Sequence, residues 1–346
     1  MPILELTRRG FAALALTAAM GTAASAADYT IRYASPYPPN HIFSQADQEY
    51  FKKVEEESGG RVAFQPYWAG TLISDREGMD QLASGVADMA FIAPIYSRTG
   101  KDITKSMSGW LDPRLNPVQK VELFWRIWDK YEALRDEYDS IHLIAAHAGD
   151  NMHIQTADRA VRSVADLDGL RLKATGESVT VLNELGAAAV AMPMGEVYVA
   201  LQKGILDGTV APYETLIGFK FAEVINYYTT IPMPRSAYGS RAMNIDSWNA
   251  LPEDIQAILT ENRIYWAEQV DKFAAAQDEE GKAYGMEQGV EFIEPDQETL
   301  DAVLAAQNKV WSARAEELDA KGLPGTEIMN DMAKWSKEIL AADGEG

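Results

Sequence analysis

The chain has 346 residues, with 31 lysines and arginines against 52 aspartates and glutamates, which gives a formal net charge of −21. This length suggests about two domains, and a hydrophobic fraction of 47% excludes a disordered tail protein. The lack of cysteine in the sequence excludes disulfide scaffolds, cysteine–zinc sites and thiol catalysis. Phosphate backbones would repel so acidic a chain, so we do not expect it to bind nucleic acid.

The first 26 residues have the three parts of a secretory signal peptide. Arg8 and Arg9 precede an apolar run at 11–20, and the small-residue motif Ala-Ser-Ala follows at 24–26. The run is shorter than the roughly 20 apolar residues that span a bilayer, so we expect export and cleavage, not membrane insertion. The mature chain would then begin at Ala27. The paired arginines also resemble a twin-arginine signal, but they occur in ordinary signals too, and the export route stays open.

The first part of the mature chain alternates between strands and helices. One strand ends in the proline-rich turn at 35–40, and the helix after it stops at Gly59-Gly60. Asn116 and Pro117, a cap and a first-turn proline, open a further helix whose tryptophan-rich stripe we interpret as core. We predict strands at 29–33, 62–67, 88–92 and 141–146, and helices from 43 to the stop at 59, at about 75–84, and from 117 onward.

A second set of strands and helices follows, and then a helical tail. We predict strands at 170–173, 190–192 and 206–210, and helices at about 177–186, 195–203, 253–285, 300–321 and 327–341. A helix of about 30 residues within 253–285 would be about 45 Å long, which is enough to brace two domains. Two alternating sets in series predict two lobes with mostly parallel sheets, and ligands in such folds bind where loops leave the strand ends.

Enzyme signatures are scarce in the sequence. There is no G-x-G-x-x-G, no P-loop and no G-x-S-x-G elbow. Of the four histidines, His147 and His153 could meet Asp150 at a loop and bind a metal, as in an exported metal-dependent hydrolase or lyase. Histidines without a metal are commoner than histidines that bind one. We therefore interpret the chain as a binding protein rather than an enzyme, and we expect no cofactor. A structural or signal-sensing role is a third possibility.

Several motifs of the mature chain, none specific alone, occur in a characteristic order. The strongest element is Asp-Leu-Asp-Gly-Leu-Arg-Leu-Lys at 166–173. The others are Val-Glu-Glu-Glu-Ser-Gly-Gly-Arg-Val at 54–62, Gly-Thr-Leu at 70–72, Leu-Ala-Ser-Gly-Val-Ala-Asp-Met-Ala at 82–90, Leu-Gly-Ala at 185–187, Glu-Val-Tyr-Val-Ala-Leu-Gln-Lys-Gly at 196–204, Asp-Gly at 207–208 and Leu-Pro-Glu-Asp at 251–254. In this order the motifs resemble one known family, the DctP-type extracytoplasmic solute-binding proteins of tripartite ATP-independent periplasmic (TRAP) transporters.

The resemblance implies an α/β, two-lobed periplasmic-binding-protein (Venus-flytrap) fold with crossing strands and a long lobe-spanning helix. The lobes would close over one small molecule, and the closed protein would deliver it to integral-membrane TRAP permease subunits from the periplasm. We expect residues 27–150 with 235–258 to form lobe I, and 151–234 with 259–346 to form lobe II.

The resemblance also implies a ligand clamp, but this sequence departs from it. The family's strand usually ends in an arginine that grips a carboxylate, and here that position is Lys173, a point charge without the planar fork. The default ligand is still a carboxylate, with Lys173 as the counter-charge and nearby hydroxyls as donors. An amine, amino alcohol or zwitterion, held by Glu214, Asp150 and aromatic rings, is the alternative.

Each candidate residue also has an ordinary structural interpretation. A lysine at a strand end is usually exposed, Glu214 could simply start a helix, and Asp150 could hold a turn. Each aromatic residue is by itself more often packing than ligand contact, and Trp68 and Tyr213 are the pair we favour for the cleft. The predicted ligand-binding set is Lys173, Trp68, Glu214, Tyr213, Asp150, Tyr96, Tyr37, Ser35 and Tyr238.

Overall fold

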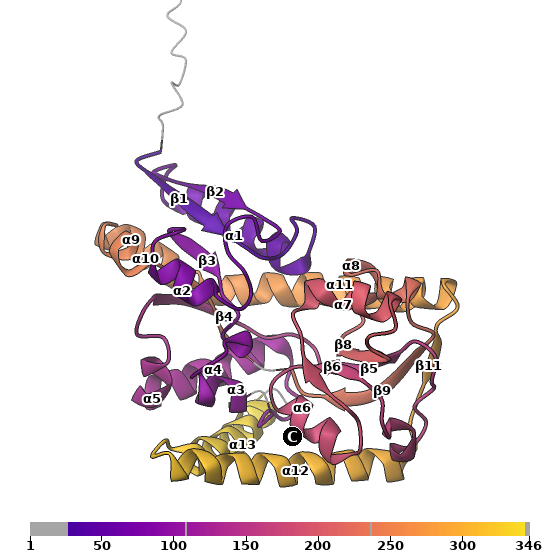
Figure 1. Cartoon of the computed structure of the whole chain (residues 1–346). Helices are drawn as coiled ribbons and strands as arrows, with labels where there is room; N and C mark the ends of the chain where they lie inside the picture. The colour runs from indigo at the N-terminus through magenta and orange to yellow at the C-terminus, as the bar shows by residue number, and fades with distance from the viewer. Residues whose placement is uncertain (1–26, 108, 236, 343–346) are drawn as a thin grey trace, which may run out of the picture.

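The chain forms two mixed β-sheets, each flanked by helices, in a computed structural model that describes residues 27–107, 109–235 and 237–342 (Figure 1). The signal peptide expected at 1–26 lies outside the described residues. Within the described ranges, no helix combines the length and the apolar character needed to cross a membrane. We call the two sheets with their helices the first and the second lobe.

The first lobe is built on a five-stranded sheet with the order β2-β1-β3-β10-β4. Its strands are β1 (Tyr29–Ala34), β2 (Val62–Tyr67), β3 (Met89–Phe91), β4 (His142–His147) and β10 (Tyr238–Met243). Its helices are α1 (Ile42–Glu57), α2 (Gly78–Ala83), α3 (Asp102–Met107), α4 (Pro117–Lys130), α5 (Glu132–Asp136), α9 (Ile245–Asn249) and α10 (Glu253–Glu261), and a short 3₁₀ turn spans Pro94–Tyr96.

The second lobe is built on a six-stranded sheet with the order β11-β9-β5-β8-β6-β7. Its strands are β5 (Met152–Thr156), β6 (Leu172–Ala174), β7 (Val190–Ala191), β8 (Gly208–Ala211), β9 (Tyr227–Met233) and β11 (Glu291–Ile293). Its helices are α6 (Glu177–Glu184), α7 (Met194–Gln202) and α8 (Thr215–Gly218), with 3₁₀ turns at Val164–Leu167 and Phe221–Glu223.

Local sequence signals explain the best-predicted elements. Asn116 caps α4 by accepting a hydrogen bond from the backbone N–H of Gln119, and the Gln119 side chain accepts one in return from the N–H of Asn116. Pro117 occupies the first turn, where no N–H is needed. Gly59 and Gly60, both with positive φ, end the turn after α1. The predicted core stripe of α4 is confirmed at Val121 and Trp125, which are buried.

Two crossovers connect the lobes. The chain leaves β4 and enters β5 through residues 148–151, and it returns from β9 to β10 through residues 234–237. The expectation of mostly parallel sheets is wrong at these strands, because β10 runs antiparallel to β3 and β4, and β5 runs antiparallel to β8 and β9. Two segments that cross between the same lobes in opposite directions pair antiparallel when they lie side by side.

Two long helices touch both lobes. α11 (Arg263–Glu287) packs on α1, α4 and β4 of the first lobe and on α8 of the second. α12 (Gln297–Ala320) packs on α3 of the first lobe and on α6 of the second, and Figure 1 shows it on the other side of the second sheet from α11. The uninterrupted helix predicted at 253–285 is broken at Asn262, whose side chain donates a hydrogen bond to the carbonyl of Ile258 at 2.9 Å.

The C-terminal helix α13 (Gly325–Ala342) packs against α12 and α4. Ile328, Met332 and Ile339 of α13 share one buried apolar cluster with Leu123 and Phe124 of α4. The lobe boundaries expected from the sequence stay a prediction. This packing nevertheless favours placing α13 with the first lobe rather than with residues 259–346 of the second.

A buried polar cluster fixes α1, β1, β10 and α11 to one another. The carboxylate of Asp47 accepts hydrogen bonds from Arg241 Nε at 2.6 Å, the Tyr33 hydroxyl at 2.6 Å and Trp266 Nε1 at 2.8 Å. The Asp47 and Arg241 side chains are each 1% exposed. The Arg241 guanidinium also lies over the ring of Trp266, with 4.0 Å from Cζ to the ring centroid. Because every one of these charges is enclosed, the ion pair depends on having both partners present.

Candidate functional site

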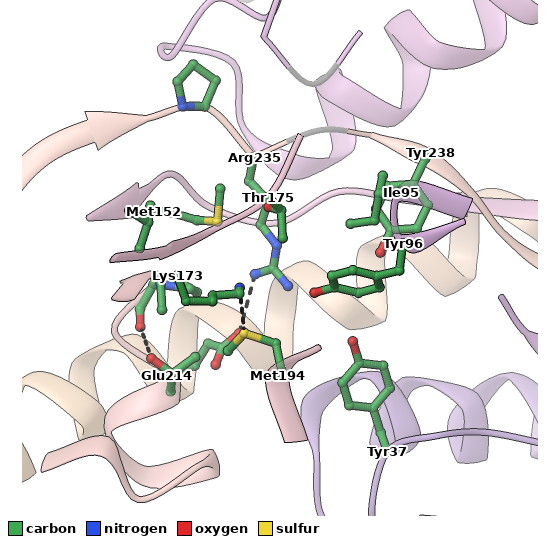
Figure 2. A pocket seen from close by; sticks show the side chains of 15 residues that line it. Tyr37, Ile95, Tyr96, Met152, Lys173, Thr175, Met194, Glu214, Arg235 and Tyr238 are labelled. Atoms are coloured by element: carbon green, nitrogen blue, oxygen red, sulfur yellow. Dashed lines mark hydrogen bonds and ion pairs between the residues drawn. The ribbon is translucent and has the colours of Figure 1, made fainter. Parts of the chain in front are cut away.

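A cavity lies between the two lobes, beside both crossovers (Figure 2). The first lobe lines it with residues after β1 and after β3, and the second lobe with residues of β6, β8 and the segments that follow them. The lining residues are Tyr37, Ile95, Tyr96, Met152, Lys173, Thr175, Met194, Val210, Ala211, Pro212, Glu214, Thr215, Pro234, Arg235 and Tyr238. A small molecule in this cavity would therefore touch both lobes.

Arg235 is the arginine of this cavity, and it comes from the second crossover. Its Nη1 donates to Oε1 of Glu214 at 3.3 Å, and 17% of its side chain stays exposed, against 3% for Glu214. Figure 2 shows the guanidinium pointing into the space between Lys173 and Tyr96. Its position depends on Gly149 of the other crossover, because a Cβ there would lie 2.6 Å from Nη1 and 2.9 Å from Cδ of Arg235.

Lys173 lies on β6 and is 2% exposed. Its Nζ donates to the sulfur of Met194 at 2.9 Å, and it forms no ion pair with a carboxylate in the part of the chain that the structure describes. Burial, together with the neighbouring positive charge of Arg235, lowers the pKa of Lys173 to about 7, against the opposing effect of Asp75 and Glu214. Any anion that enters the cavity would therefore stabilise the charged form of Lys173.

Two carboxylates act on this cavity, and neither is in its ordinary state. Burial raises the pKa of Glu214, although Arg235 opposes the shift. Burial also raises the pKa of Asp75 to about 6, with Lys173 opposing. Asp75 does not line the cavity, and its buried Oδ1 has no hydrogen-bond partner among the described residues.

The lining combines a positive balance with apolar and hydroxyl-bearing walls. Two cations, Lys173 and Arg235, face one carboxylate, that of Glu214. The hydroxyls of Tyr37, Tyr96 and Tyr238 point toward the same space as the guanidinium (Figure 2). Methionine, isoleucine, valine, alanine and proline side chains complete the walls. This composition suits a small anion with an apolar body and few polar groups.

The structure brings five of the nine predicted site residues to the cavity. Lys173 and Glu214 come from the second lobe, Tyr37 and Tyr96 from the first, and Tyr238 from the start of β10. They arrive at one place because strand ends of both lobes face the same cleft.

Trp68 and Tyr213, the aromatic pair favoured from the sequence, do not line the cavity. Trp68 packs on Tyr33 and Phe51, with ring centroids 5.6 and 6.4 Å apart. Tyr213 stacks on Tyr228 at 4.3 Å. The residues on either side of Tyr213, Pro212 and Glu214, do line the cavity, so the side chain of Tyr213 falls on the opposite side of the chain after β8.

Ser35 and Asp150 also lie outside the lining. Ser35 is fully buried, and its Oγ accepts a hydrogen bond from the N–H of Tyr37 at 3.2 Å, so it supports the turn that carries Tyr37. Asp150 lies in the first crossover, next to the backbone carbonyl of Gly149, which accepts a hydrogen bond from Lys120 Nζ at 3.0 Å. Their effect on the cavity is therefore indirect.

The histidine loop considered as a metal site is not assembled. His147 is fully buried and packs among aromatic rings, with centroid distances of 4.6 Å to Phe43 and 4.4 Å to Tyr238. His153 lies in β5, where its Nδ1 is 3.2 Å from the carbonyl of Ile231. Across the described ranges, no three histidine, aspartate or glutamate side chains are placed to hold a metal ion.

Sequence reasoning missed one of the two cations of the cavity lining, Arg235. It stands in the apolar stretch Ile-Pro-Met-Pro-Arg at 231–235, where a single arginine is unusual enough to serve as a signal. Met152 and Met194 were missed as well, because nothing in their local sequence separates a cavity wall from ordinary core.

Comparisons with known proteins agree with this architecture. The model of the family "Bacterial extracellular solute-binding protein, family 7" (DctP) matches residues 33–318. A monocarboxylate 2-oxoacid-binding periplasmic protein of Nostoc sp. is 26% identical over 212 residues, which cover 60% of this chain and 57% of that protein. The alignment thus spans little more than half of that relative's length.

Two solved structures share the fold over nearly their whole length. A TRAP solute-binding protein from Rhodoferax ferrireducens, in complex with copurified benzoate, has a TM-score of 0.83 at 22% identity and covers 91% of this chain and 99% of its own. A TRAP periplasmic solute-binding protein from Bordetella bronchiseptica, with bound (R)- and (S)-mandelate, has a TM-score of 0.80 at 21% identity and covers 90% and 99%. Both have the two-lobed α/β fold described above.

Proposed function

Since this chain belongs to family 7 of the bacterial extracellular solute-binding proteins, the solute-binding proteins of TRAP transporters, we propose that it captures a small organic monocarboxylate between its lobes. The closed complex then presents the solute to the integral-membrane permease subunits of the transporter. The observation that carries this proposal is the guanidinium of Arg235, which points into the interlobe cavity with the ammonium of Lys173 beside it.

Arg235 replaces the strand-end arginine that the chain lacks at Lys173. A guanidinium can bind a carboxylate through two parallel N–H···O bonds, whereas an ammonium acts as a point charge. Glu214 engages Nη1 at 3.3 Å, longer than a strong charged hydrogen bond, so a ligand carboxylate can compete for the same guanidinium. With Lys173 included, the lining has one positive charge more than its own carboxylate balances, which favours a ligand of charge −1.

The position of the cavity supports capture by closure. Tyr37 and Tyr96 belong to the first lobe, and Lys173 and Met194 to the second, so a ligand between them contacts both. A ligand shifts an open–closed equilibrium only if it binds the closed state more tightly. Moving it from 1:99 to 99:1 takes about 5.5 kcal/mol, and charged hydrogen bonds from both lobes are large enough to contribute much of that.

The relatives' ligands support a carboxylate. They include a monocarboxylate 2-oxoacid, benzoate and mandelate, and a further TRAP solute-binding protein holds D-glucuronate, a carboxylate with a polar body. An amine would have to displace Arg235 from Glu214 and lie beside two cations, so an amine or amino alcohol has less support than an acid.

Calorimetric titration with matched acids and amines tests the proposal. We expect benzoate, mandelate or pyruvate to bind and benzylamine to give no heat of binding. Arg235→Met should weaken the binding of the best acid at least about 100-fold, because it removes two charged hydrogen bonds worth about 1.5–3 kcal/mol each.

Two further variants sharpen this test. Arg235→Lys should restore only part of the affinity, because an ammonium cannot form the parallel pair of bonds. Lys203→Met, at an exposed position just after α7, removes the same charge outside the cavity and should leave binding unchanged. Tight binding of benzylamine, or an Arg235→Met protein that binds the acids as the unmodified protein does, would refute the proposal.

A further inference from the structure

Outside the cavity, the rim of the interlobe cleft carries two adjoining grooves of opposite charge. One, which we call the basic groove, is lined by Arg76, Arg98, Lys105 and Arg314 with the single carboxylate Glu177. The other, the acidic groove, is lined by Asp75, Glu77 and Glu196 with Arg76 as its single cation. Because Arg76 lines both, the grooves are two parts of one rim, and positive charge gives way to negative charge along it.

The basic groove leads directly to the cavity. Ile95 and Tyr96 line both the groove and the cavity, so a molecule in the groove already touches the wall of the binding site. The groove also takes residues from both lobes, since Arg98 and Lys105 follow β3 whereas Gly176 and Glu177 begin α6.

The cations of this groove are not equally neutralised. Arg314 is held by Asp102 at 2.8 Å and by Glu317 at 2.8 Å. Arg76 and Arg98 are exposed, and within the described ranges neither forms an ion pair. Their positive charges therefore lie in solvent, without a neutralising partner among the described residues, at the entrance of the cleft.

We propose that the basic groove is an encounter site, where an anionic solute is attracted before it moves past Tyr96 to Arg235. The inference rests on the proposed function, because it needs a carboxylate as the cargo. On a chain with a net charge of −21, the average field repels anions, so a local positive entrance decides where an anion can approach. The acidic groove beside it repels the same solute, which makes the basic groove the favoured way in.

An encounter site of this kind alters affinity through the association rate constant and leaves the dissociation rate constant nearly unchanged. Steering by charge changes the association rate, and it weakens as salt shortens the Debye length from about 30 Å at 0.01 M to about 8 Å at 0.15 M. The dissociation rate depends on contacts in the cavity, to which Arg98 does not belong.

Stopped-flow fluorescence with benzoate, mandelate or pyruvate as the probe tests the proposal. At low salt, we expect Arg98→Glu to lower the association rate constant about fivefold, with a dissociation rate constant within about twofold of the unmodified protein. At 0.15 M salt the two proteins should converge. Lys282→Glu, which makes the same change of charge at an exposed position on α11 outside both grooves, is the matched control and should leave the rate nearly unchanged.

An Arg98→Glu protein with an unaltered association rate constant at low salt would overturn the proposal. An equal decrease of the association rate constant in Lys282→Glu would overturn it too, because the effect would then come from the net charge and not from the groove. If calorimetry shows tight acid binding while the rates stay unaltered, only the encounter site fails. If no carboxylate binds the unmodified protein, the proposed function fails and the encounter site with it.

Discussion

Gly149 offers a direct test of how the crossovers position Arg235. Its φ is not positive, so an alanine fits the backbone, but the new Cβ would lie 2.6 Å from Nη1, 2.8 Å from Cζ and 2.9 Å from Cδ of Arg235. Ordinary contact begins at 3.4 Å, so the guanidinium must move by about 0.8 Å, the difference between 3.4 and 2.6 Å. Arg235 is a flexible side chain, and we therefore expect Gly149→Ala to fold.

The expected loss is in ligand affinity. Charged N–H···O bonds are about 2.7–2.9 Å long, and a shift of this size carries them to the limit of hydrogen bonding. Loss of about 2 kcal/mol, one such bond, corresponds to roughly 30-fold weaker binding. The free energy of unfolding should change by less than about 1 kcal/mol. The new Cβ displaces only the flexible end of the Arg235 side chain, and alanine has fewer conformations than glycine in the unfolded state.

Calorimetry with benzoate, mandelate or pyruvate, together with urea unfolding, measures both quantities. Gly218→Ala is the control, since its Cβ would meet nothing closer than Gln277 Oε1 at 3.9 Å. In an Arg235→Met background, Gly149→Ala should have no further effect on affinity. Unchanged affinity in the single variant, or equal losses in both backgrounds, would show that Gly149 does not position the guanidinium.

Two further predictions concern buried charges. Burial is the main cause that lowers the pKa of Lys173 to about 7, and a bound carboxylate would raise it again. The affinity for a carboxylate should therefore fall as pH rises above about 7, by up to tenfold per pH unit. Calorimetry from pH 6 to 9 checks this, and a Lys173→Met protein whose affinity falls equally steeply with pH would contradict it. Asp47→Ala should cost about 3–5 kcal/mol in urea unfolding, because it leaves Arg241 buried without its partner. Asp254→Ala, which removes an exposed ion pair with Arg61, should cost less than about 1 kcal/mol, and equal losses in the two variants would refute the argument.

Elements with local signals could be predicted from the sequence. The strand predicted at 62–67 has the same bounds in the structure. Asn116 indicated the start of α4, because asparagine is a preferred residue at a helix N-cap. The strand before the first crossover was predicted at 141–146, one residue early, whereas β5, β9 and β10 were missed. The chain at 227–243 carries prolines at 232 and 234 and holds one strand of each sheet, so none of the usual boundary signals shows where the first strand ends and the next begins.

The site could be predicted only where one strand end carries the information. Lys173 lies in the short strand β6 and Glu214 lies three residues after the end of β8, and both reach the cavity. Tyr213 does not line the cavity, and the sequence could not show this because side-chain direction just after β8 depends on one residue of register. Arg235 could not be placed at all, since its role comes from the crossover that carries it and from the open space over Gly149, two features that are far apart in sequence.

The unbroken course of α11 along both lobes limits how far the molecule can open. A helix of 25 residues is about 38 Å long, and helices in proteins curve smoothly with radii of roughly 60–100 Å. Bending of that kind over the whole length turns one end relative to the other by roughly 20–35°. As long as α11 stays packed on α1 and on α8, it can bend elastically but not hinge. The rotation of one lobe relative to the other then stays within that range of angles.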